Sequence, residues 1–163
     1  MLTCEICQCQ ARIRPQEAVT STTAHAPLIT ARDATINFAS QTAIMLTRLE
    51  RAIGHQRSLT VAAGLPDGRG VVIAGLQVTA PELGAVTCSL TECPGTACYS
   101  PKTNSLVVKC AEGTWLSVDK LQTQDRAMLE AKEWWNGVKG MGWVQDGLFG
   151  FGCNVTAVTR DSC

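Results

Sequence analysis

The sequence has no net charge and few charged residues of either sign. Its 163 residues include 14 basic and 14 acidic side chains, and charged residues make up 17%. A balanced chain exerts no overall attraction on nucleic acid, so any RNA contact must come from a local basic patch. Because 45% of the residues are hydrophobic, the composition argues against wholesale disorder and predicts one compact domain with extensions.

Long apolar runs are also missing, and histidine is scarce. No stretch approaches the ~20 apolar residues of a membrane span, and Glu5, Arg12 and Arg14 interrupt the start of the chain. We therefore expect no membrane partner and no secretory signal. Arg12 and Arg14 fit a mitochondrial presequence whereas Glu5 does not, so the start of the chain leaves the compartment open.

Cysteine is plentiful by comparison. Nine cysteines, an odd count without a signal peptide, favour reduced and mostly buried thiols over a secreted disulfide framework. Cys4, Cys7 and Cys9 are close enough to share a metal ion, but no second Cys-x-x-Cys pair supplies the fourth ligand. The cysteines between 88 and 98 have five-residue spacing, which does not fit a zinc knuckle. We therefore expect no metal site.

Hydrophobic periodicity predicts two helices. Residues 40–53 repeat apolar side chains at helical spacing, with Ser40 as the expected N-cap. Residues 126–136 return to the same spacing, and Gly137 is the expected stop. The apolar faces consist of Met45, Leu46, Leu49 and Ile53 in the first helix and Met128, Ala131, Trp134 and Trp135 in the second.

Between these helices the period changes to two, which is typical of half-buried strands. Leu65-Pro66-Asp67-Gly68 predicts a turn, and Ala111-Glu112-Gly113 predicts a hairpin in which Cys110 points inward. The expected strands are 59–61, 71–79, 94–99, 105–110 and 114–121. In 71–79 the side chains expected to face the core are Val72, Ala74, Leu76 and Val78.

These elements predict a mainly β fold: a small OB-like β-barrel of about five strands, with a preceding helix, a closing helix and extended termini. The domain organisation that follows is a linker or hinge over 1–39, the barrel with its leading helix over 40–139, and a Gly-rich tail over 140–163.

Two stretches of the chain carry a family resemblance. Residues 24–33, which contain Ala26-Pro27 and Ile29-Thr30, continue to Ile36-Asn37-Phe38. Downstream come Pro94-Gly95-Thr96, Leu106–Gly113, Leu121-Gln122, Met128 and Asn136-Gly137, in that order. The series resembles the hinge and carboxy-terminal domain of methionyl-tRNA formyltransferases over roughly 24–139. Two departures stand out: Gln124–Ala127 replaces a more basic segment, and Phe38 stands where the family often has Trp.

The resemblance implies an OB-like domain that binds initiator tRNA in translation initiation, in the mitochondrion or alternatively in the cytoplasm. In this family a separate amino-terminal domain binds 10-formyltetrahydrofolate and transfers the formyl group. No catalytic residue of that domain matches here, since His25 lies in the hinge match and His55 lacks the right surroundings. We therefore expect no cofactor in this chain, no formyl transfer by it alone, and a separate or missing catalytic domain as a partner.

Basic side chains in the matched region are the candidates for RNA contact, because they neutralise phosphates. The predicted tRNA-binding residues are Lys102, Lys109, Lys120, Arg126, Lys132 and Lys139. The tryptophans Trp115, Trp134, Trp135 and Trp143 could stack on bases. The alternative to tRNA binding is a small barrel that serves as a protein-interaction or metal-binding module.

Overall fold

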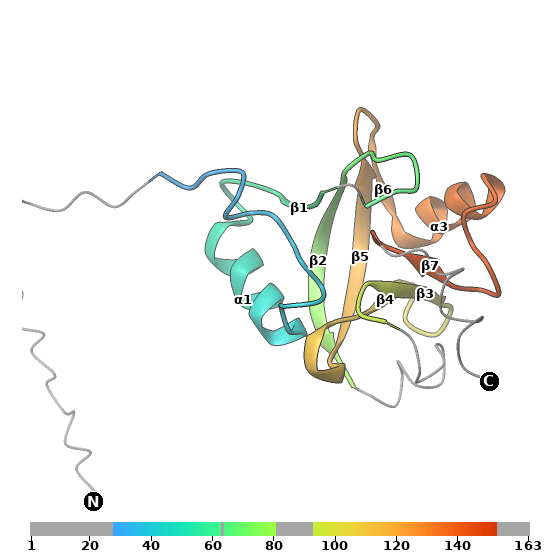
Figure 1. Ribbon diagram of the computed structural model, residues 1–163, viewed down its shortest axis with the longest axis horizontal. Helices are drawn as coiled ribbons and strands as arrows, with labels where there is room; N and C mark the ends of the chain where they lie inside the picture. The colour runs from blue at the N-terminus through green and yellow to red at the C-terminus, as the bar shows by residue number, and fades with distance from the viewer. Residues whose placement is uncertain (1–27, 63, 81–92, 153–163) are drawn as a thin grey trace, which may run out of the picture.

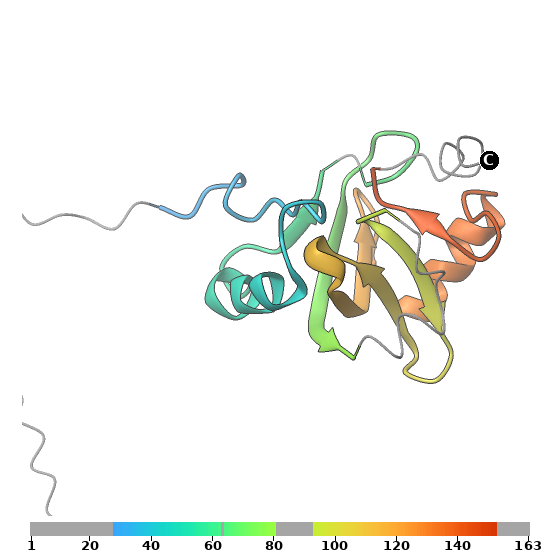
Figure 2. The ribbon, with the colours of Figure 1, turned by 60° about the horizontal axis from the view of Figure 1, so that its bottom comes forward.

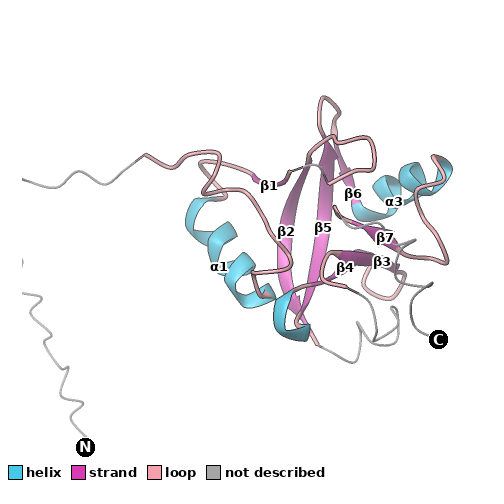
Figure 3. Cartoon of the chain, in the orientation of Figure 1, coloured by secondary structure: helices cyan, strands magenta, loops and turns pink. Residues whose placement is uncertain are grey.

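A strongly bent antiparallel sheet forms the centre of the molecule (Figures 1 and 3). The computed structural model describes residues 28–62, 64–80 and 93–152. The strands run in the order β1-β2-β5-β4-β3-β7, and β6 pairs with β5 beside β4. Their bounds are β1 Leu59–Val61, β2 Val71–Thr79, β3 Thr96–Ser100, β4 Ser105–Lys109, β5 Trp115–Thr123, β6 Met128–Glu130 and β7 Phe149–Gly150.

The mainly β class with a leading and a closing helix is confirmed, but the sheet is not a closed barrel. It has seven strands instead of about five, and within the described residues its outer strands β1 and β7 do not pair with each other. Both are short, with three and two residues, so neither offers a ladder long enough to close the sheet. The OB topology stays a prediction. The Phe38 and Phe151 rings, with centroids 5.6 Å apart, lie at the open seam.

Strand β2 turns a different set of side chains inward than its sequence alternation predicts. Val71, Ile73 and Leu76 are buried, whereas Val78 is 53% exposed. The alternation breaks at Gly75, which has a φ of +71°. The ladder joins Ala74 to Lys120 and Leu76 to Val118 on either side of this break. A backbone kink there reverses which parity of side chain faces the core, so the predicted inward face is wrong at Val72 and Ala74. Val78 has the same parity as Leu76 but lies near the end of the strand and is exposed, so its predicted burial is also wrong.

Helix α1 (Ala43–Ile53) confirms the first predicted helix with a shorter start. Thr42, and not Ser40, is the N-cap, because the Thr42 hydroxyl accepts from the Met45 amide. The Ser40 amide is used in a turn, where it donates to the Asn37 carbonyl. The helix lies on the outside of β2 in both ribbon views (Figures 1 and 2) and buries Ala43, Leu46 and Thr47.

The second predicted helix starts later and ends later than its sequence pattern suggests. Residues 128–130 form strand β6, which pairs with β5, so Met128 is 39% exposed and does not line a buried helical face. Helix α3 covers Ala131–Gly140 and passes through Gly137. Local hydrophobic periodicity does not show this pairing, because the pairing depends on contacts with a second strand, β5.

The tryptophans of helix α3 pack on aromatic rings from two parts of the chain, β3 and the segment after the helix. The Trp134 ring lies 5.4 Å from Phe149 and 5.9 Å from Phe151 between centroids, and its indole N–H donates to Thr123 at 3.1 Å. Trp135 stacks on Tyr99 at 6.4 Å. The described part of the predicted Gly-rich tail therefore completes the core.

The hairpin prediction is confirmed, whereas the predictions for the cysteines have different outcomes at different positions. A short 3-10 helix, η1 (Ala111–Gly113), joins β4 to β5, and Cys110 is fully buried, as predicted. Cys98, however, is disulfide-bonded, so the expectation of reduced thiols is wrong at that position. None of the helices in the described ranges has the length and apolar character needed to cross a bilayer.

Candidate nucleic-acid interface

The six predicted RNA-contact residues are distributed over several elements. Lys102 lies in the β3–β4 turn, and Lys109 ends β4. Strand β4, whose ends lie about 13 Å apart, separates them. Lys120 lies in β5, Arg126 in the β5–β6 turn, and Lys132 and Lys139 on α3.

Two of these basic side chains already have neighbours within the domain. The Lys120 ammonium lies 3.6 Å from the Glu130 carboxylate on the adjacent strand. The Lys109 ammonium lies 5.9 Å from the centroid of the Trp115 ring. Both contacts favour the positive charge where it is, and Glu130 partly cancels the field of Lys120.

The remaining predicted residues are exposed, and two of them are next to an acidic residue in the sequence. Lys132 and Lys139 are seven residues apart on α3, so they share a helical face, and Glu133 follows Lys132 directly. Arg126 follows Asp125 in the β5–β6 turn. This surface is mixed in charge, and its contact with tRNA stays a prediction.

Sequence reasoning missed a second basic surface, around helix α1. Four arginines are exposed there: Arg32 in the turn before α1, Arg48 and Arg51 on the helix, and Arg57 just after it. The structure gives none of them an ion pair with a described carboxylate within 4.0 Å. We call these four residues the arginine face.

The two acidic residues of the same region accept hydrogen bonds from within the domain. The Asp33 carboxylate accepts from the Thr30 amide at 2.8 Å and from the Thr30 hydroxyl at 2.7 Å. These hydrogen bonds, with smaller contributions from Arg32 and Arg57, hold the pKa of Asp33 below its ordinary value. The turn before α1 lies beside the segment after it, because the Ile36 amide donates to the Thr60 carbonyl and the Thr60 amide to the Ala34 carbonyl, each at 2.9 Å.

Glu50, the second acid, points away from the arginine face. Its two carboxylate oxygens accept from the Gly75 amide at 2.8 Å and the Leu76 amide at 2.9 Å, on the kink of β2. A local charge count would have indicated this surface, since residues 28–62 contain four basic and two acidic side chains. The sequence does not show that Asp33 accepts hydrogen bonds from Thr30 or that Glu50 accepts them from two β2 amides.

The tryptophans do not offer base-stacking surfaces. Trp115 and Trp134 are 3% exposed and Trp135 is 9% exposed. Trp143 is partly buried, and the Arg69 guanidinium lies 6.0 Å from its ring centroid. These four tryptophans are therefore not placed to stack on bases. The exposed side chains of the domain support contact with phosphates instead.

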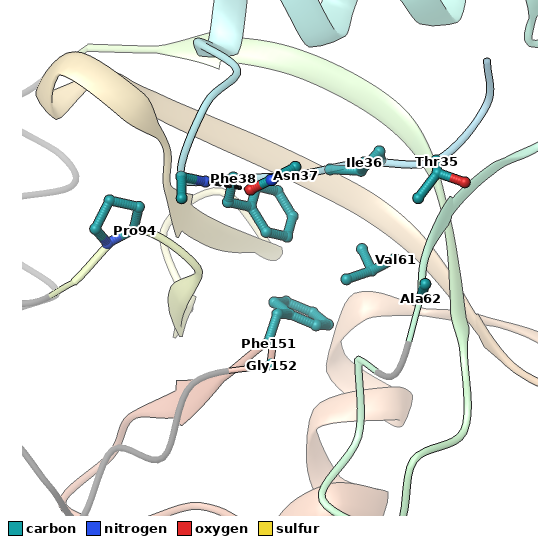
Figure 4. Close-up of a pocket in the computed structure, with 10 residues that line it drawn as sticks. Thr35, Ile36, Asn37, Phe38, Val61, Ala62, Pro94, Phe151 and Gly152 are labelled. Carbon is teal, nitrogen blue, oxygen red and sulfur yellow. Dashed lines mark hydrogen bonds between the residues drawn. The ribbon is translucent and has the colours of Figure 1, made fainter. Parts of the chain in front are cut away.

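A pocket of about 350 Å³ lies at the open seam of the sheet, between the segment before α1 and the end of β1 (Figure 4). Phe38 and Phe151 face each other across it, with Val61 beside them and Pro94 at its rim. Its lining has no ionisable side chain. The pocket therefore offers apolar surface and backbone groups but no acid, base or nucleophile.

Metal and acid–base chemistry have little support in the described part of the chain. No group of three or more metal-ligating side chains occurs there, and Cys4, Cys7, Cys9 and Cys88 lie outside it. His25 also lies outside it. His55 is exposed, and the contact of its ring is with the Gln56 amide at 3.1 Å.

Comparison with known families identifies the domain. A family model described as the formyl transferase C-terminal domain matches residues 28–139. The match begins in the segment before α1 and ends near the end of α3, so it spans β1 to β6 and both helices but not β7. A search of curated protein sequences gave no significant match. Because the family model covers most of the chain, this protein belongs to the formyl transferase C-terminal domain family.

Proposed function

We propose that this chain is the tRNA-binding C-terminal module of a methionyl-tRNA formyltransferase-like protein and acts in translation initiation. Family membership supports a formyltransferase context, and the ordered motifs from the hinge to Asn136-Gly137 favour the methionyl-tRNA enzyme. The observation that carries tRNA binding is the arginine face, which is unpaired although the whole chain has no net charge. Such a role belongs in the mitochondrion, or in the cytoplasm of a bacterial source.

Binding to initiator tRNA at several salt concentrations tests this proposal. Fluorescence anisotropy of a labelled transcript should show binding that weakens as salt rises, with a slope in log K against log salt of about −0.7 to −0.9 per phosphate contact. A double-stranded DNA of equal charge is the control for polyanion attraction. Absence of binding at low salt, or binding that ignores salt, would contradict the proposal.

The chemistry of formyl transfer would come from a separate catalytic domain carrying 10-formyltetrahydrofolate. Attack by an amine on a formyl carbon needs a proton acceptor and donors for the developing oxyanion. In the described residues the exposed His55 contacts only Gln56, and the seam pocket has no ionisable group. Incubation with charged initiator tRNA and the folate donor should therefore give no product above blank, and measurable turnover would refute this.

A further inference from the structure

The arginine face gives the proposed tRNA module a defined contact surface. Resting on that proposed function, we infer that Arg48, Arg51 and Arg57, with Arg32 beside them, make most of the contacts of this chain with the tRNA phosphate backbone. The lysines of α3 and of the β3–β4 turn then have a smaller role. This assignment places RNA on the outer side of α1, opposite the surface that packs on β2 (Figures 1 and 2).

Helix geometry brings Arg48 and Arg51 to one surface. The inner face of α1 is fixed by Ala43, Leu46 and Thr47, which are buried. Arg48 and Arg51 are three residues apart, so they are neighbours on the outer face and lie about 4.5 Å apart along the axis. The Arg57 amide donates to the Ile53 carbonyl at 2.8 Å, so Arg57 stands about one turn beyond the end of the helix.

The acids of this region offset its charge only in part, since four arginines stand against two carboxylates. Asp33 is held by Thr30, and Glu50 is held by two amides of β2. The lysine surface differs, because Lys120 lies 3.6 Å from Glu130, whereas none of the four arginines has a described carboxylate within 4.0 Å. A polyanion is therefore attracted more strongly to the α1 side than to the α3 side.

The side-chain type also favours phosphate. A guanidinium is planar, always charged, and can give two parallel hydrogen bonds to one phosphate. A protein partner would be expected to need a contiguous apolar patch. On the outer side of α1 the large exposed apolar residues are Ile44 and Met45, at the opposite end of the helix from Arg57. Four unpaired guanidiniums beside this small apolar area fit a nucleic-acid backbone better.

Two charge-matched triple variants of the full chain test the inference. One is Arg48→Gln, Arg51→Gln and Arg57→Gln, and the other is Lys102→Gln, Lys132→Gln and Lys139→Gln; each removes three exposed positive charges. At 0.1 M salt one phosphate contact contributes roughly 5- to 8-fold in affinity. We expect the arginine variant to bind initiator tRNA about 100-fold more weakly, with a salt slope smaller by about 2 to 3. The lysine variant should lose less than about 5-fold.

A protection experiment uses the unsubstituted chain, so its result does not depend on whether the variants fold. Phenylglyoxal modification, mapped by peptide mass spectrometry, should be slowed by tRNA at Arg48, Arg51 and Arg57. Arg69, which lies 2.6 Å from Asp67 and near Trp143, is the internal control. Absence of tRNA protection at the three arginines would overturn the inference.

The outcomes separate this inference from the proposed function. If the unmodified chain does not bind tRNA, the proposed function and the inference both fail. If it binds, and the lysine variant loses as much affinity as the arginine variant or more, tRNA binding stands and the arginine assignment is wrong. Loss confined to the arginine variant, together with protection of the three arginines, supports both.

Discussion

Glu50 connects helix α1 to the kink of β2, and its removal should destabilise the domain measurably. The Gly75 and Leu76 amides donate to its two carboxylate oxygens at 2.8 and 2.9 Å. Gly75 has no partner in the β2–β5 ladder because the backbone kinks there. The Glu50 carboxylate therefore gives the Gly75 amide an acceptor that the sheet does not provide. The perturbations are Glu50→Ala, which removes both acceptors, and Glu50→Gln, which keeps one oxygen.

The expected magnitude follows from the two hydrogen bonds. A hydrogen bond to a charged group contributes about 1.5–3 kcal/mol when it is shielded from water. Glu50 is only half-buried and borders a pocket of about 220 Å³, so water can replace part of the lost interaction. We therefore expect a loss of about 2 kcal/mol in the free energy of unfolding for Glu50→Ala and about 1 kcal/mol for Glu50→Gln.

Urea denaturation followed by circular dichroism measures these changes, and Glu133→Ala is the matched control. Glu133 is exposed on α3, and no hydrogen bond or ion pair of its side chain is found, so its loss should cost only a few tenths of a kcal/mol. Hydrogen exchange gives a local readout, because the Gly75 and Leu76 amides should exchange faster in Glu50→Ala. If Glu50→Ala is no less stable than Glu133→Ala and exchange at both amides is unchanged, the reasoning is refuted.

Three further outcomes are expected. Gly75→Ala should cost more stability than Gly113→Ala, because both positions have positive φ (+71° and +67°) but only at 75 would the new Cβ approach another residue, Asp119, at 3.0 Å; equal urea midpoints would contradict this. Burial raises the pKa of the Cys110 thiol from 9.0 to about 12. Between those values the unfolded chain binds fewer protons than the folded one, so stability should fall as pH rises above about 9, by at most about 1.4 kcal/mol per pH unit. A Cys110→Ala variant should lack this part of the slope, and parallel pH profiles would disprove the linkage. Iodoacetamide at pH 8 should label exposed Cys93 and leave Cys110 unlabelled until urea is added; labelling of Cys110 in the native state would show that its burial is incomplete.

Local signals in the sequence were sufficient for much of the fold. Strand β1 and strand β2 were predicted with the bounds that the structure shows, and helix α1 and the hairpin around Ala111–Gly113 were predicted within a few residues. These elements depend on hydrophobic period and turn chemistry, which adjacent residues carry. The series of motifs from the hinge to Asn136-Gly137 likewise indicated the family that the model match then showed.

Features that depend on distant partners were decided only by the tertiary structure. Met128–Glu130 looks like the start of a helix but pairs with β5, and the inward side of β2 reverses at Gly75 because Glu50 and Asp119 pack at the kink.

The charge of the candidate interface is likewise determined partly by the sequence and partly by the tertiary structure. The sequence determined which residues are basic and that the whole chain is neutral. Only the folded chain decided where these charges lie, because two β2 amides hold the Glu50 carboxylate at the kink and Glu130 pairs with Lys120. Composition counts charges, whereas the field at a surface depends on which of them the fold has already paired.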